Sequence, residues 1–337
     1  MSVIASTAGR GTFQQARDEK ESVYDAVITL APQQTPLLAM MNRGAKPGTT
    51  KFEWLVDNAG ARPSAMSGVA LRGEGADATA TATRDRVMCF NRTGIFGDTI
   101  GVTFSQQASV LHGVNDELEY QIVENTKERL VDLEFTSLNG TIDVDSITTP
   151  NSGSTGNIRK TGGFLDMIAN PTNYVDTGTL GTTALAYTAA ADTTLSADNI
   201  ELAQQTCAER GGSPSYAKQV FAAGAAKRVV SRLFAPVAGS TAVYRRHLGK
   251  TGDDRSIVLP VDVIETDFGV LHMHWHQDMP ADTLFAMDPE YCHLMPFRDF
   301  QAYELGLVGS QYQYLIEGEF GFRCLAFNSM WRLTNVD

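Results

Sequence analysis

Three histidines spaced two residues apart are the residues of this sequence that come nearest to a reactive site. His272, His274 and His276 would all face one side if they lay on a single β-strand, because successive side chains of a strand alternate between its faces. Imidazole is a common zinc ligand, and Asp278 could supply a nearby carboxylate. The three Cβ atoms would spread over about 13 Å, however, too far to close one tetrahedral site. We therefore predict a polar strand face and keep a metal-dependent enzyme as the alternative.

The other candidate motifs lack residues that their chemistry needs. Residues 156–161 hint at a phosphate-binding loop, but no glycine comes directly before the lysine and no buried strand precedes the segment. Asp143 and Asp145 lack the glycine and the distal glutamate of a calcium loop. Neither a GxSxG nor an HExxH motif is present. The sequence thus predicts no catalytic residue, no metal site and no cofactor.

Charge and composition narrow the function classes further. The 337 residues carry a formal net charge of −12, which argues against a protein that grips nucleic acid with a basic face. No run of about 18 apolar residues occurs, and the N-terminus lacks the apolar segment of a signal peptide, so we expect no membrane contact. Four widely spaced cysteines form no CxxC pair and predict reduced core residues: Cys89, Cys207, Cys292 and Cys324.

One long helix, predicted at 115–138, organises the elements that would position any site. Asn115 is the expected N-cap, and Asn139-Gly140 is the expected end. Apolar residues at helical spacing predict a main buried stripe and a second stripe confined to the later half. The main stripe comprises Leu118, Ile122, Leu130 and Leu133, and the second comprises Val131, Phe135 and Leu138.

A long two-stranded arm is the simplest geometry for the segment before this helix. Residues 51–57 alternate and are aromatic, which is typical of a strand, and residues 86–90 give a second strand signal. Residues 58–85 between them are rich in Ala, Gly, Ser and Thr and cannot form a core of their own. A two-stranded ribbon is marginal alone and needs another surface to lie on. A disordered surface loop is the alternative.

The remaining elements are a mixture of helices and strands. We expect strands at 95–105 and between 257 and 287, and helices at 196–210, with Ser196 as the cap, and at 225–234. A short helix at 23–28 and a helix starting at Pro36 after a Thr35 cap come earlier. The tail, residues 311–333, holds two alternating runs around Gly318 to Gly321.

Several of these segments together resemble the SU10-type major capsid proteins of tailed bacteriophages. They are Tyr24-Asp25-Ala26-Val27, residues 31–38 (APQQTPLL), residues 51–57 (KFEWLVD), residues 86–107, and the acidic helix 117–138 closed by Asn139-Gly140. Later matching segments are Thr266-Asp267-Phe268-Gly269, Met287-Asp288 and Glu317-Gly318-Glu319. The resemblance covers nearly the whole chain, although residues 141–195 contribute little.

The resemblance implies the HK97-like capsid fold, of the α+β class. It assigns residues 1–50 to an N-terminal arm and 51–92 to an extended loop. Residues 93–164 and 301–337 would form a peripheral domain around the spine helix 115–138, and residues 165–300 an axial domain.

The function implied is that of a major capsid protein, not an enzyme, which self-assembles into the icosahedral shell around double-stranded DNA. The implied partners are further copies in hexamers and pentamers, a portal protein, separate scaffolding and cement or decoration proteins, and packaged DNA held non-specifically. The expected location is the virion capsid, assembled in the cytoplasm of a bacterial host. Two alternatives remain: an encapsulin-like shell around protein cargo, and a metal-dependent enzyme that uses His272, His274 and His276.

Overall fold

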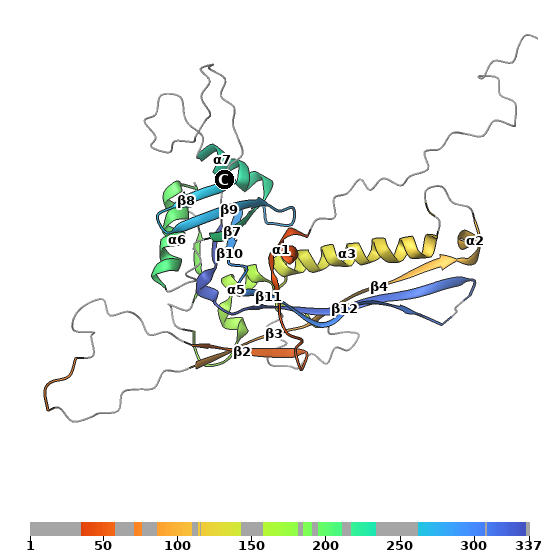
Figure 1. The fold of residues 1–337 in the computed structure, drawn as a ribbon, viewed down its shortest axis with the longest axis horizontal. Helices are drawn as coiled ribbons and strands as arrows, with labels where there is room; N and C mark the ends of the chain where they lie inside the picture. The colour runs from red at the N-terminus through yellow and green to blue at the C-terminus, as the bar shows by residue number, and fades with distance from the viewer. Residues whose placement is uncertain are drawn as a thin grey trace, which may run out of the picture.

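The computed structural model describes most of the chain and places its elements in an elongated part and a rounder part (Figure 1). The elongated part is a long helix above a sheet, and the rounder part holds a second sheet at one end of that helix. The helix expected at 23–28 lies outside the described residues. These are 35–57, 71–75, 86–109, 114, 116–142, 158–180, 185–190, 195–210, 217–233, 262–306 and 309–334.

The predicted long helix is α3 (Glu117–Asn139), which spans roughly 35 Å at 1.5 Å per residue. Its N-cap is Asp116 rather than Asn115, which lies outside the described residues. The Asp116 carboxylate accepts the backbone N–H groups of Leu118 at 2.9 Å and Glu119 at 3.1 Å. A carboxylate at this position satisfies free N–H groups and also complements the positive end of the helix dipole.

The side of α3 that is buried differs from the predicted one. Leu133 and Leu138 are fully buried, but Leu130 is 37% exposed and Phe135 is 51% exposed. The prediction that Leu130 belongs to the main buried stripe is therefore wrong, as is the burial of Phe135. The physical reason is that α1 (Pro36–Met40) and other parts of the core pack on the side of α3 that carries Leu133 and Leu138, and leave the side with Leu130 and Phe135 open to solvent.

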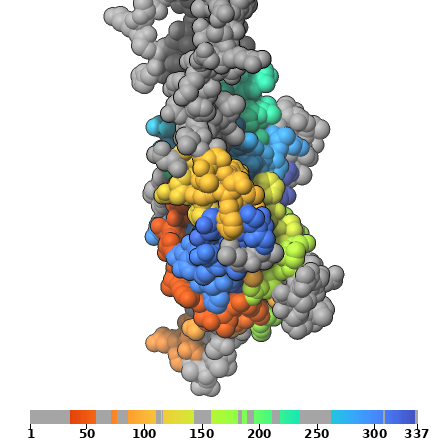
Figure 2. Space-filling model, turned by 90° about the vertical axis from the view of Figure 1, so that its right-hand side faces the viewer, coloured from red at the N-terminus to blue at the C-terminus, as the bar shows by residue number. Residues whose placement is uncertain are grey.

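A four-stranded sheet runs beneath α3, in the order β1-β11-β12-β4. Figure 2 looks onto the tip of this elongated part, where the yellow-orange start of the helical layer lies over the blue strands. Ile100 and Val102 are buried on the side of the sheet that α3 covers. The strands are β1 (Asn42–Arg43), β4 (Gly94–Thr103), β11 (Cys292–Glu304) and β12 (Gln311–Cys324), and α2 (Phe104–Gln107) follows β4.

Strand β12 runs without a break through the glycines that were expected to separate two runs of the tail. A Cβ atom on Gly318 would lie 2.7 Å from the ring of Phe300, and one on Gly321 would lie 2.6 Å from the ring of Phe52. Glycine is needed at both positions because an aromatic ring packs directly on the strand backbone. The glycines therefore mark close packing and not a turn.

The rounder part contains a six-stranded mixed sheet in the order β6-β13-β10-β7-β9-β8. Strand β10 is buried on both faces: Leu284 and Ala286 join the core under two helices, whereas Phe285 and Met287 join the core shared with α5. The strands are β6 (Tyr187–Ala190), β7 (Ala217–Ala222), β8 (Val263–Thr266), β9 (Gly269–Trp275), β10 (Thr283–Met287) and β13 (Trp331–Thr334). The helices are α5 (Phe164–Ala169), α6 (Ala197–Glu209) and α7 (Gly224–Leu233), with single turns η2 (Pro171–Tyr174) and η4 (Phe327–Ser329).

The predicted strands at the base of the arm are confirmed, and they pair with each other. Strand β2 (Lys51–Asp57) pairs antiparallel with β3 (Arg86–Arg92) along its whole length, and β5 (Val175–Thr177) adds a third strand. Between Asp57 and Arg86 the structure describes only residues 71–75, so the rest of the expected extended loop lies outside the described residues.

Sheet membership cuts across the expected domain limits. The limit between residues 300 and 301 falls inside β11, and β13, from the segment 301–337, belongs to the six-stranded sheet. Strand β5, from the segment 165–300, joins β2 and β3 instead. A strand pairs with whichever sheet edge offers free backbone groups, so position along the chain does not fix which sheet it joins.

Helix α6 has the cap that was predicted for it. The Ser196 hydroxyl accepts the backbone N–H of Asn199 at 3.2 Å at the start of α6, as expected. Helix α7 starts one residue earlier than the predicted range 225–234 and ends one residue earlier. Within the described residues, none of the helices combines the length and the apolar character needed to cross a membrane.

Candidate functional site

The three histidines do not converge on one point. His272 and His274 share a face of β9, and His276 lies one residue beyond the end of the strand. The rings of His274 and His276 both lie against the ring of Phe221, with centroids 5.6 and 5.9 Å away. The Nε2 atom of His274 lies 2.5 Å from Oε1 of Gln219, and burial lowers the pKa of this histidine. His276 is buried, with Nε2 2.8 Å from Oε1 of Glu134. Across the described ranges, no group of three His, Cys, Asp or Glu side chains is placed to hold a metal ion.

The partner of His276, Glu134, is a fully buried carboxylate. Its Oε1 accepts the backbone N–H of Leu37 at 2.7 Å, and its Oε2 accepts that of Leu38 at 2.9 Å. These are free N–H groups of the first turn of α1, so Glu134 of α3 caps a different helix. Thr35, the predicted side-chain cap, occupies the N-cap position but makes no capping hydrogen bond.

The hydrogen bonds of His276 define its role. Its Nδ1 accepts the backbone N–H of Asp278 at 3.1 Å, so the ring proton belongs on Nε2, which donates to Glu134. The ring of Phe221 packs edge-on at 5.9 Å between centroids. His276 is therefore a structural donor that completes a three-donor shell around the buried carboxylate. We call Glu134, His276 and the Leu37 and Leu38 amides the helix clasp.

A second buried carboxylate, Glu319 of β12, joins several strands. It accepts hydrogen bonds from the Thr93 hydroxyl at 2.5 Å, from Nη2 of Arg159 at 2.8 Å and from Nε of Arg298 at 3.3 Å. Arg298 also pairs with Glu317, and this hydrogen bond raises the pKa of Arg298. A buried charge that is fully paired costs several kcal/mol when one partner is removed, so the cluster fixes the relative position of its strands.

The four cysteines are buried and free, as predicted. Cys292 and Cys324 face each other across β11 and β12, and their sulfur atoms lie 3.9 and 3.8 Å from the sulfur of Met330. Burial raises the pKa of Cys89 to about 12. Reactive cysteines sit in partly exposed surroundings, whereas these four are buried, so they act in packing.

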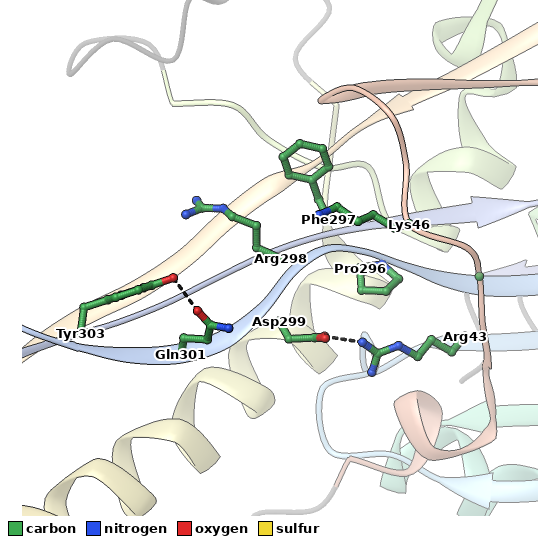
Figure 3. A pocket seen from close by; sticks show the side chains of 9 residues that line it. Arg43, Lys46, Pro296, Phe297, Arg298, Asp299, Gln301 and Tyr303 are labelled. Carbon is green, nitrogen blue, oxygen red and sulfur yellow. Dashed lines mark hydrogen bonds and ion pairs between the residues drawn. The ribbon is translucent and has the colours of Figure 1, made fainter.

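A surface cavity of about 400 Å³ lies where β1 meets β11 (Figure 3). Arg43 pairs there with Asp299, the ammonium of Lys46 lies 5.6 Å from the ring centroid of Phe297, and Tyr303 donates to Gln301. The charged groups thus already have partners within the chain, and the lining lacks a paired nucleophile and base. Its lining residues are Arg43, Gly44, Lys46, Pro296, Phe297, Arg298, Asp299, Gln301 and Tyr303.

Apolar side chains lie exposed on the elongated part. Val123 and Leu130, two turns apart on α3, are 46% and 37% exposed, and Ile95 of β4 is 49% exposed. Single exposed apolar residues are ordinary, but here they lie on one helix and on a strand of the sheet beneath that helix. The chain therefore combines buried polar groups that fix its own fold with an elongated part that leaves apolar surface uncovered.

Comparison with known proteins agrees with this arrangement. The family of SU10 major capsid proteins matches residues 6–337, and a search of curated proteins found no match. The capsid of cyanophage A-1(L) has a TM-score of 0.69 at 10% identity, covering 97% of this chain and 99% of that chain. A phage G structure of major capsid and decoration proteins has a TM-score of 0.54 at 10% identity, covering 99% and 100%.

A cargo-compartment shell shares the fold as well. The SrpI encapsulin of Synechococcus elongatus PCC 7942 has a TM-score of 0.55 at 9% identity, covering 95% of this chain and 93% of that chain. At such identities the structural likeness shows a common fold, whereas the family match over nearly the whole sequence decides the assignment. The chain belongs to the SU10 major capsid proteins, has the HK97-like capsid fold, and is a structural protein of the tailed-phage head shell and not an enzyme.

Proposed function

We propose that copies of this chain assemble as hexamers and pentamers into an icosahedral head that encloses double-stranded DNA, in the cytoplasm of a bacterial host. The observation that carries the proposal is the match of the SU10 major capsid proteins to residues 6–337. Assembly interfaces of obligate complexes bury roughly 2,000–5,000 Å² each, enough to order segments that have no core of their own.

In this proposal, each part of the chain is assigned to a domain by the sheet that it forms. Helix α3 with the four-stranded sheet forms the peripheral domain, and the six-stranded sheet with α6 and α7 forms the axial domain. Residues 1–50 form the arm, and β2 and β3 form the base of the extended loop 51–92. The mixed sheet membership of β5, β11 and β13 then ties the domains into one subunit.

Other partners follow from the same proposal. A portal protein and a separate scaffolding protein complete the head, and the decoration proteins in the phage G structure support a similar partner here. A net charge of −12 favours weak, non-specific contact with packaged DNA, because like charges repel.

Electron microscopy of particles made by the purified chain tests the proposal. We expect six-fold and five-fold capsomers in closed shells. Rings of another order, or open filaments, would contradict it. Particles from infected cells that contain a host protein in place of DNA would favour the cargo compartment.

We also predict that the shell has no covalent links between subunits. An isopeptide cross-link from the extended loop needs a lysine amine, and no lysine occurs between Lys51 and Lys127. The guanidinium groups of Arg62, Arg72 and Arg84 stay protonated at neutral pH and are poor nucleophiles. Mature particles boiled in detergent and reductant should run as one band near 36.5 kDa. A ladder of multimers after this treatment would refute the prediction.

A further inference from the structure

We propose that the free edge of β4 pairs with an extended backbone segment of a second copy of this chain, so that the four-stranded sheet continues across a subunit boundary. The inference rests on the shell-forming function, because only assembly brings copies into lasting contact. It assigns an interface to a strand edge and not to a side-chain pocket.

The register of β4 shows which of its backbone groups are free. Strand β4 is the last in its sheet and pairs with β12 from Gly94↔Phe320 to Thr103↔Gln311 without a bulge. The Phe104 N–H donates to the Ser310 carbonyl at 3.2 Å, which fixes the alternation of the antiparallel ladder. Even-numbered residues of β4 therefore bond to β12, and the N–H and C=O groups of odd-numbered residues point outward.

The outward groups have almost no partners. Among the residues that the structure describes, no hydrogen bond reaches the outward backbone groups of Ile95, Gly97 or Gly101. The Thr99 N–H is held at 2.7 Å by the neighbouring Asp98 side chain, which agrees with an outward direction. Such a row of free donors and acceptors is a template for another strand.

Another edge strand, β2, is protected in a way that β4 is not. By the same reasoning, from the Thr93 N–H bond to the Thr50 carbonyl at 2.9 Å, the outward residues of β2 are Lys51, Glu53, Leu55 and Asp57. Three of these four carry charges, which blunt an edge against pairing. The outward residues of β4 are Ile95, Gly97, Thr99, Gly101 and Thr103, and none is charged.

The outer surface of β4 also has room for a neighbour. Because Ile100 and Val102 are buried under α3, the odd-numbered side chains lie on the opposite, exposed face. The two glycines there, Gly97 and Gly101, present no side chain, so larger cross-strand side chains of a partner fit against them. Assembly into a shell brings a second copy of the chain to this edge. Pairing through backbone groups requires no particular side chains from that copy.

Proline at position 101 tests the pairing. Gly101→Pro removes an outward N–H that has no partner among the described residues and leaves the bonds to β12 intact, whereas Gly101→Ala keeps that N–H and serves as the matched control. We expect both variants to fold, and Gly101→Pro to need at least about ten-fold more protein to assemble than Gly101→Ala, about 1.4 kcal/mol per contact. Assembly of the two variants at the same protein concentration would overturn the inference.

Hydrogen exchange decides the matter if Gly101→Pro does not fold. In shells assembled from the purified wild-type chain alone, the amides of Ile95, Gly97 and Gly101 should exchange at least about ten-fold more slowly than in the unassembled chain. Amides that stay unprotected in shells, or that are already protected before assembly, would overturn the inference. Failure of the wild-type chain to assemble would instead count against the shell-forming function.

Discussion

Replacing Glu134 by glutamine is expected to lower the free energy of unfolding by about 2–4 kcal/mol, because the helix clasp surrounds this carboxylate with donors only. The Leu37 and Leu38 amides and Nε2 of His276 all donate to it. A glutamine side chain offers one oxygen and one NH₂ group, so at least one buried donor would face another donor. If His276 moved its proton to Nδ1, the N–H of Asp278 would lose its acceptor instead.

Denaturant unfolding of the unassembled chain, followed by circular dichroism, measures this effect. The matched control is Glu124→Gln, on the same helix, where the carboxylate pairs with Lys127, whose side chain is 47% exposed. We expect the control to stay within about 0.5 kcal/mol of wild type, as is usual for surface changes. A Glu134→Gln variant as stable as the control would show that the clasp does not hold α1 on α3.

Leu133→Asp is expected to abolish the soluble folded chain. Leu133 is fully buried in the core beneath α3, and an unpaired carboxylate there costs more than about 4 kcal/mol, a large part of a domain's stability. Leu130→Asp, three residues earlier, should fold, because this side chain is 37% exposed and the new carboxylate can reach water.

Soluble yield and far-ultraviolet circular dichroism of the two variants give the comparison. Equal behaviour of Leu130→Asp and Leu133→Asp, whether both fold or both fail, would contradict the facing of α3 described above. A folded Leu130→Asp variant that forms fewer shells would add that the exposed side of α3 at Leu130 lies in an interface.

The sequence was informative wherever structure depends on near neighbours. The strand 51–57, the Ser196 cap of α6 and the end of α3 at Asn139 follow from local spacing and capping, and the structure confirms them. The same local rules chose the wrong cap for α3, since Asn115 and Asp116 are both good caps and adjacent.

Contacts between distant segments could not be predicted in this way. Glu134 binds Leu37 across 97 residues and His276 across 142 residues, so no local pattern pairs them. One signal was present: Glu134 lies four residues from both Leu130 and Leu138, which makes it an acidic residue within an apolar helical stripe. Such a residue indicates either a surface position or a buried carboxylate with hydrogen-bond partners. In the structure Glu134 is fully buried, so the second interpretation holds.

The buried side of α3 and the sheet to which each strand belongs could not be predicted either, because both depend on contacts between distant segments. Apolar residues such as Leu130 and Phe135 follow helical spacing, yet what covers them depends on where α1 and α5 end. If neighbouring subunits bury this surface, a single chain shows the apolar spacing of a buried helix side but lacks the subunit that covers it. That explains why a capsid subunit can expose residues that spacing alone assigns to its core.

Light scattering of the purified chain, across a range of salt and protein concentrations, tests the central claim most directly. A major capsid protein should appear as capsomers or closed shells, many times the 36.5 kDa mass of one chain, with assembly favoured at higher concentration. A compact, monodisperse monomer under every condition would contradict the claim that this chain builds a shell.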